Sequence, residues 1–82
     1  MILEKDLIEK TIEVIIADGN RDFRDALADS LRADTRIEVI ADVSSGADLI
    51  DRVDGKRPDV IIMDLVLSDL DGFGALKQIN MK

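Results

Sequence analysis

The sequence contains no cysteine and no histidine, and it has one proline and two aromatic residues. Without cysteine it has no disulfide bonds or thiolate metal sites, and without histidine it has no imidazole base and none of the usual zinc ligands. No apolar run approaches the ~20 residues that a membrane-spanning helix needs. Charges interrupt residues 1–10, unlike a secretory signal. We therefore expect a cytoplasmic protein without membrane attachment.

What the sequence does contain is enough for one small domain. It has 82 residues, of which 46% are apolar, and isoleucine, leucine and valine far outnumber the aromatic residues. Such a composition is typical of buried strands covered by helices. The 18 acidic residues exceed the 11 basic residues, which gives a net charge of -7. A negative field repels nucleic-acid phosphates, so we expect no direct nucleic-acid binding by this segment.

Short apolar runs alternate with helical patterns along the chain. Strands are predicted at 12–17, 37–41 and 60–63. A first helix follows a cap at Asn20, with inward residues at Phe23, Ala26, Leu27 and Leu31 and water-facing residues at Arg21, Asp22, Arg24, Asp25 and Asp29. A second helix follows a cap at Ser45, has an apolar stripe at Ala47, Ile50 and Val53, and ends at Gly55 before Pro58. A last helix is predicted from Gly72, with Phe73, Leu76 and Ile79 facing inward.

This alternation of strands and helices predicts an α/β fold. Right-handed crossovers between successive strands give a parallel sheet that is covered by helices on both faces. Residues 1–11 fall outside the pattern and are predicted to be an N-terminal extension, either one or two helical turns against the body or a frayed terminus.

Two of the predicted strands end in a carboxylate, at Asp18 and Asp64. Ligands of open parallel sheets bind at the carboxyl ends of the strands, and both acids would meet there if these strands are neighbours. Paired carboxylates suit Mg²⁺, and a carboxylate beside that ion can act as a nucleophile toward phosphorus. The simpler interpretation is that each Asp forms a turn or caps a helix, and we favour that interpretation for Asp69 and Asp71.

Three stretches together resemble the receiver domain of bacterial response regulators. They are residues 15–21, residues 57–65, and Asp71 with Gly72, which lie seven and eight residues after Asp64. The resemblance covers about residues 12–81, and we assign 12–82 to a partial receiver domain. In detail, residues 17–21 and 37–40 are most similar to the receiver of sporulation regulators in endospore-forming Firmicutes.

The resemblance implies a role for three residues. Asp64 matches the phosphoacceptor, which takes its phosphoryl group from a histidine kinase or a phosphotransfer protein. Asp18 and Asp64 match metal ligands, and Val66 matches the position whose backbone carbonyl also binds Mg²⁺. Gly19 stands where the family has its second acid, which weakens the expected Mg²⁺ site. Ser68 stands where the family usually has a proline.

The resemblance also implies a flavodoxin-like sheet, of which this chain supplies three strands in the order 2-1-3 of the usual five. The third strand would then be an apolar edge, which favours self-association or completion of the domain by another segment. The later hydroxyl and lysine residues of the family cannot be assigned before Lys82.

Three functions remain open at this point. The first is a non-enzymatic phosphoacceptor module of a transcriptional response regulator, which would control a DNA-binding domain beyond residue 82. The second is a degenerate receiver-like module for dimerisation or interaction that does not depend on phosphorylation. The third is a small Mg²⁺-dependent phosphatase, against which the lack of a histidine base and of a phosphate-binding glycine loop argues.

Overall fold

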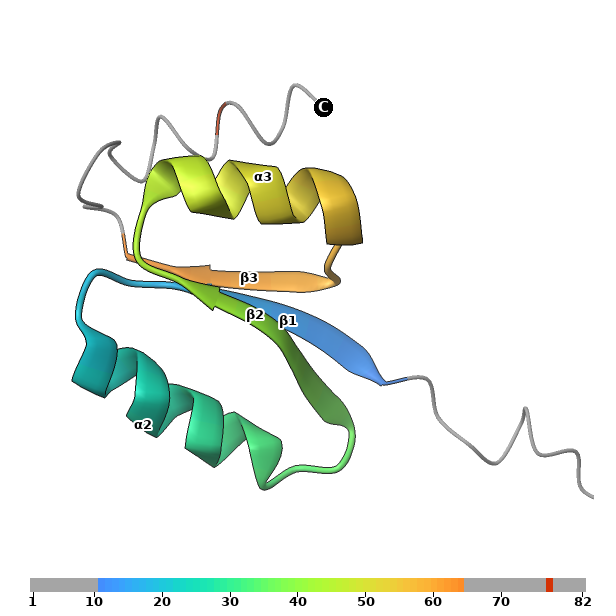
Figure 1. The fold of residues 1–82 in the computed structure, drawn as a ribbon. Coiled ribbons are helices and arrows are strands. Elements are labelled where there is room, and N and C mark those ends of the chain that lie inside the picture. The colour runs from blue at the N-terminus through green and yellow to red at the C-terminus, as the bar shows by residue number, and fades with distance from the viewer. Residues whose placement is uncertain (1–10, 65–76, 78–82) are drawn as a thin grey trace, which may run out of the picture.

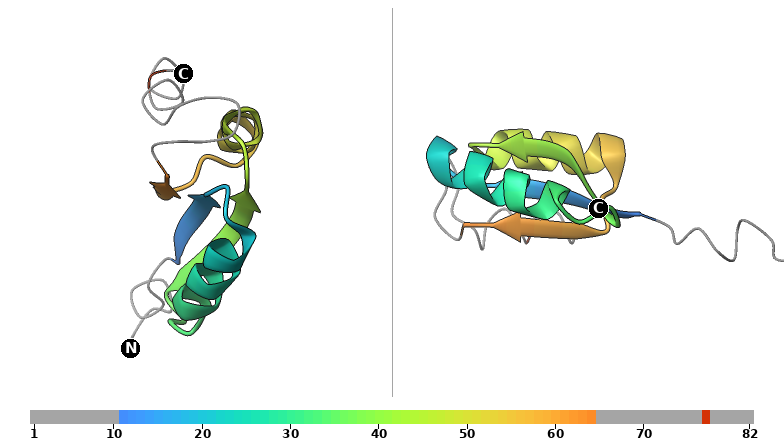
Figure 2. Two further views of the ribbon diagram at one scale, coloured as in Figure 1. Left: turned by 90° about the vertical axis from the view of Figure 1, so that its left-hand side faces the viewer. Right: turned by 90° about the horizontal axis from the view of Figure 1, so that it is seen from below.

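The computed structural model describes residues 11–64 and residue 77, and it shows a three-layer α/β arrangement. The elements are β1 (Ile12–Ala17), α2 (Arg21–Arg32), β2 (Ile37–Val43), α3 (Gly46–Lys56) and β3 (Val60–Met63). The strands are parallel and lie in the order β2-β1-β3, with α2 on one face of the sheet and α3 on the other (Figures 1 and 2). The predicted fold and strand order are confirmed.

The register between β1 and β2 contains one irregularity. Val14 pairs with Val39, whereas the next residue, Ile15, pairs with Ala41, so that Ile40 is an extra residue in β2. A bulge of this kind reverses which residues of a strand face each side of the sheet. The sequence prediction placed the end of β2 at residue 41, but the strand continues to Val43.

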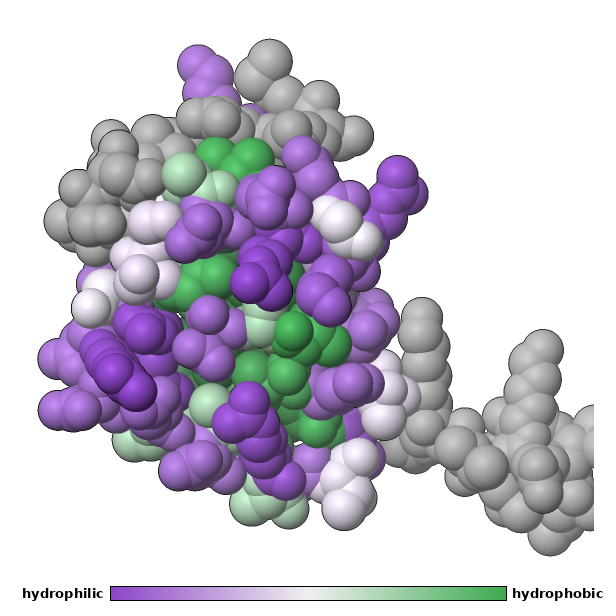
Figure 3. Space-filling view, in the orientation of Figure 1, coloured by the Kyte–Doolittle hydropathy of each residue, from purple (hydrophilic) through white to green (hydrophobic). Residues whose placement is uncertain are grey.

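The core has two layers, one on each face of β1. Alternate residues of a strand point to opposite faces, and β1 is buried from Val14 to Ala17. The layer toward α3 is built on Ile15, Ala17, Val43 and Leu49, and the layer toward α2 is built on Val14, Ile16 and Ala28. In Figure 3 apolar side chains run through the middle of the molecule with hydrophilic side chains around them. Central burial on both faces explains why β1 is almost purely aliphatic.

The helix α2 begins as predicted, but a different set of its residues faces the sheet. The Asn20 side chain accepts a hydrogen bond from the backbone N–H of Phe23 and caps the helix. Ala28 is the buried residue, whereas Ala26 is exposed and Phe23 keeps 52% of its surface exposed. The prediction for Ala26 and Phe23 was therefore wrong. The inward positions follow the series 24, 27, 28 and 31, in which residues three, four and seven apart share one face.

The helix α3 also begins as predicted, because the Ser45 hydroxyl accepts a hydrogen bond from the backbone N–H of Asp48. Its fully buried residue is Leu49, whereas Ala47 is exposed, which corrects the predicted stripe. The helix does not end at Gly55. It continues to Lys56 and is closed by Arg57 in the left-handed region (φ 49°, ψ 68°), whose N–H bonds to the Val53 carbonyl.

Several predictions fall outside the described residues. They concern the extension at 1–10, the loop that follows Asp64, and the helix expected from Gly72. Residue 77 alone of the last stretch is described, and it is helical. Among the described helices, none is long and apolar enough to cross a membrane.

Candidate functional site

The carboxyl ends of β1 and β3 border a cavity of about 300 Å³. Its walls combine apolar side chains of the sheet and of α2 with the two predicted carboxylates, and the lining residues are Ile16, Ala17, Asp18, Phe23, Ile62, Met63 and Asp64. The register pairs Ala17 with Met63, so Asp18 and Asp64 follow at the same level on neighbouring strands. The structure therefore brings the two acids together at one edge of the sheet, as the sequence predicts.

Asp18 is held by three hydrogen bonds, each through a different atom. Its N–H donates to the carbonyl of Val43 at 3.0 Å, which extends the β1–β2 ladder by one residue. Its carboxylate oxygen Oδ1 accepts the N–H of Asn20 at 2.8 Å and forms a turn. Its carbonyl oxygen accepts a hydrogen bond of 2.7 Å from Nη1 of Arg24. Since a carboxylate has about four acceptor sites, the turn leaves capacity for a ligand.

Asp64 lies directly after β3 and is exposed. Its N–H donates to the carbonyl of Ala17 at 2.8 Å, which fixes its backbone beside the end of β1. A carboxylate that is anchored by its backbone and open to solvent can meet an incoming phosphoryl group. Val66, the third predicted site residue, lies outside the described residues.

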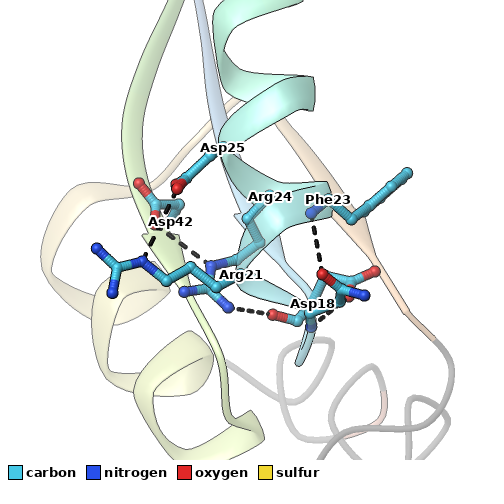
Figure 4. Close-up of polar contacts among 7 residues, drawn as sticks. Asp18, Arg21, Phe23, Arg24, Asp25 and Asp42 are labelled. Atoms are coloured by element: carbon cyan, nitrogen blue, oxygen red, sulfur yellow. Dashed lines mark hydrogen bonds and ion pairs between the residues drawn. The ribbon is translucent and has the colours of Figure 1, made fainter.

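Arg24 connects the first turn of α2 to the ends of β1 and β2. In addition to its bond with the Asp18 carbonyl, its Nε atom lies 3.4 Å from Oδ1 of Asp42 in β2. Figure 4 shows the Arg24 side chain reaching from the helix between Asp18 and Asp42, whereas Arg21 lies beside Asp25. Sequence reasoning placed Arg24 in water, which is wrong, because only 13% of its side chain is exposed.

The two carboxylates fit a magnesium site of limited strength. Mg²⁺ prefers oxygen ligands, keeps several waters, and is commonly held by one or two protein carboxylates. Asp18 and Asp64 supply two such groups, but Gly19 supplies none, and the part of the chain that the structure describes holds no cluster of three acidic side chains for a metal. An ion held there would neutralise charge on a phosphoryl group.

The clearest electrostatic perturbation lies away from this cavity, in the turn between α2 and β2. The side chain of Arg36 bonds to both carboxylate oxygens of Asp34, at 2.8 and 3.1 Å, and its backbone N–H adds a bond of 2.9 Å. These hydrogen bonds lower the pKa of Asp34 from 3.8 to about 2. The pair therefore stabilises a turn and takes no part in the site.

The structure is that of an open parallel α/β domain, a class that binds its ligands at the carboxyl ends of the strands, where Asp18 and Asp64 lie here. Within this class, residues 14–82 match the family described as the response regulator receiver domain. The chain belongs to this family, as its resemblance implied.

Solved structures support the same fold. The response regulator domain of CheB from Thermotoga maritima is 29% identical, with a TM-score of 0.86, and the match covers 89% of this chain and 55% of that one. The signal receiver domain of the putative response regulator NarL from Mycobacterium tuberculosis is 19% identical, with a TM-score of 0.85, over 89% and 59% of the two chains.

Curated relatives are longer proteins. The chain is 35% identical over 70 residues to the response regulator protein VraR of Staphylococcus aureus, which covers 85% of this chain and 34% of the relative. It is 33% identical over 69 residues to a protein-glutamate methylesterase/protein-glutamine glutaminase of Photobacterium profundum, which covers 84% of this chain and 18% of the relative. The chain therefore spans about a third or less of these relatives.

Proposed function

We propose that the chain is the receiver module of a two-component or phosphorelay transcriptional response regulator in the cytoplasm, with Asp64 as its phosphoacceptor. The observation that carries the proposal is the meeting of Asp18 and Asp64 at one cavity, on neighbouring strands of a receiver fold. The module would act as a signalling domain rather than as an enzyme on a diffusible substrate. Residues 12–82 would form the receiver part, and residues 1–11 an extension.

The proposed chemistry is one phosphoryl transfer. A carboxylate oxygen of Asp64 forms a bond to phosphorus while the bond between phosphorus and the donor breaks. With a histidine kinase or phosphotransfer protein as donor, the histidine nitrogen leaves with the electron pair of that bond and takes a proton from water. Asp18, Asp64 and the carbonyl of Val66 would hold Mg²⁺, which reduces charge repulsion between the carboxylate and the phosphoryl group.

Acetyl phosphate provides a direct test, because acetate then leaves in place of histidine. We expect the chain, incubated with acetyl phosphate and Mg²⁺, to gain one phosphoryl group that is labile to hydroxylamine, as an acyl phosphate must be. Asp64→Asn should abolish the adduct. Asp59→Asn is the matched control, because it makes the same change at the opposite end of β3, where the amide oxygen can still accept the N–H of Glu13. An unmodified wild-type chain refutes the proposal.

A second candidate is a receiver-like interaction module that works without phosphorylation. Gly19 favours it, because the cavity has only two acidic side chains among its described residues. Within the described sheet, β3 is an edge strand and its Val60 is 43% exposed, which favours self-association through this edge. This candidate is excluded if Asp64→Asn removes the output of the full regulator while its fold and self-association persist.

The similarity of residues 17–21 and 37–40 to sporulation regulators supports a narrower proposal, that the regulated process is sporulation. Deletion of the gene should then reduce the frequency of spores, and an unchanged frequency contradicts this part alone.

A further inference from the structure

Arg24 occupies a position where a charged residue is costly. It belongs to the inward series 24, 27, 28 and 31 of α2, and 13% of its side chain is exposed, compared with 82% for Arg21 three residues earlier. It also lies in the first helical turns, where the helix dipole disfavours a cation. A partly buried cation in such a place has to be compensated by specific contacts.

Those contacts all lie at the edge of the sheet that holds the site. Nη1 of Arg24 donates to the carbonyl of Asp18 at 2.7 Å, and Nε lies 3.4 Å from Oδ1 of Asp42. The guanidinium presents several donors in a fixed plane, so one side chain can reach two acceptors on different strands. Arg24 thereby joins the first turns of α2 to the ends of β1 and β2 (Figure 4).

The extra residue in β2, Ile40, places the second acceptor, Asp42, within reach of Arg24. Because Ile40 is bulged, Asp42 pairs with Ile16 and lies on the face of α2. In an uninterrupted ladder Asp42 would pair with Ala17 and face α3, out of reach of Arg24. Bulges commonly redirect a side chain next to a functional site.

We propose that Arg24 is a positioning residue for the receiver site, which it serves by holding the backbone of Asp18 so that the carboxylate of Asp18 faces the ligand beside Asp64. This inference rests on the proposed function. Of the three bonds that fix Asp18, the one from Arg24 is the only one donated by a side chain. Without it, the turn at Asp18 and Asn20 keeps its local bond and the backbone bond to Val43, but the Asp18 carbonyl loses its side-chain link to α2 and to Asp42.

The test compares Arg24→Met with Arg21→Met in the full chain. Both variants remove one positive charge from the same end of α2, and that change alone strengthens the attraction of the site for Mg²⁺. The measurement is phosphorylation by acetyl phosphate as a function of Mg²⁺ concentration, with the folded fraction followed by circular dichroism. We expect the Mg²⁺ concentration at half-maximal rate to rise about 10- to 100-fold in Arg24→Met, as for other residues that orient a metal ligand. Arg21→Met should show no rise.

A second readout needs neither metal nor phosphate. The N–H of Asn20, which bonds to the Asp18 carboxylate, should exchange with solvent faster in Arg24→Met than in Arg21→Met, as measured by NMR. Asp42→Asn keeps an oxygen acceptor but loses the charge, and should raise the Mg²⁺ requirement less than Arg24→Met does. If Arg24→Met does not fold, Asp42→Asn decides through the exchange of the Asn20 N–H, because the lost charge of Asp42 by itself raises the Mg²⁺ requirement. Unchanged exchange in Asp42→Asn then overturns the inference.

The outcomes separate the two proposals. Equal Mg²⁺ requirements in Arg24→Met and Arg21→Met overturn the role of Arg24 and leave the phosphoacceptor proposal standing. A wild-type chain that takes up no phosphoryl group refutes the phosphoacceptor proposal. Arg24 is then judged on the exchange of Asn20 alone, and equal exchange in the two variants overturns its positioning role.

Discussion

Gly19→Asp places a third carboxylate at the edge of the sheet next to Asp18. Gly19 is exposed, its backbone is not in the left-handed region, and a Cβ atom added to it would meet nothing within 4 Å. The substitution should therefore leave the fold intact. If Mg²⁺ binds between Asp18 and Asp64, the new carboxylate adds a ligand or a near neighbour to it.

The expected gain follows from electrostatics in an exposed position. Two unit charges at ~4 Å attract by about 1 kcal/mol in water, so the divalent ion gains about 2 kcal/mol from one added carboxylate. That energy corresponds to about 30-fold tighter Mg²⁺ binding. Because the site is exposed, the gain should shrink as ionic strength rises.

Isothermal titration calorimetry with MgCl₂ can measure the difference between Gly19→Asp and Gly19→Asn. The second variant has nearly the same shape and no charge, so it controls for the loss of glycine. We expect tight binding only in Gly19→Asp, and weaker binding in the wild type and in Gly19→Asn. Equal dissociation constants in the two variants would show that no cation is held beside Asp18, and would refute the reasoning.

Other predictions concern stability. Leu49→Ala should lower the free energy of unfolding by about 2–5 kcal/mol in urea denaturation, because Leu49 is fully buried, whereas Val60→Ala at the exposed end of β3 should cost much less; similar losses would contradict the core described here. Gly55→Ala should stabilise α3 by about 0.5–1 kcal/mol in the same assay, because Gly55 lies within the helix with open space around it, and destabilisation would contradict this. The pKa of Asp34 is about 2 in the folded chain and 3.8 when its contacts with Arg36 are absent, as in the unfolded chain. The contribution of Asp34 to stability is therefore present above about pH 4 and is lost as pH falls toward 2. Asp34→Asn should flatten that part of the curve of melting temperature against pH, and an unchanged curve would show that Arg36 does not depress this pKa.

Local signals in the sequence were enough to predict most of the architecture. The strands at Ile12–Ala17 and Val60–Met63 follow from short aliphatic runs, and the starts of both helices follow from the caps at Asn20 and Ser45. The parallel sheet follows from the alternation of strands and helices with right-handed crossovers, whereas the strand order 2-1-3 was implied by the resemblance to receiver domains. The pairing of β1 with β3 then brings Asp18 and Asp64 together.

What the sequence did not predict depends on tertiary contacts. Arg24 was assigned to water because it is charged, although the spacing of residues 24, 27, 28 and 31 already placed it on the inward face. No glycine or other local signal marks the bulge at Ile40, which is defined only by the pairing of β2 with β1. Gly55 was taken for the helix end on intrinsic preference, but the chain turns at Arg57 instead.

The bulge also bears on how the length of this segment can change during evolution. Removing Ile40 would leave Val39 opposite Val14 and Ala41 opposite Ile15, so every remaining residue would keep its partner and its side of the sheet. Inserting a residue elsewhere in β2 before Asp42 would instead turn the following residues over and bring Asp42 into an aliphatic layer, where an uncompensated carboxylate is strongly destabilising. Homologues that are one residue shorter here are thus compatible with the same arrangement, whereas other single-residue insertions and deletions in β2 should be rare.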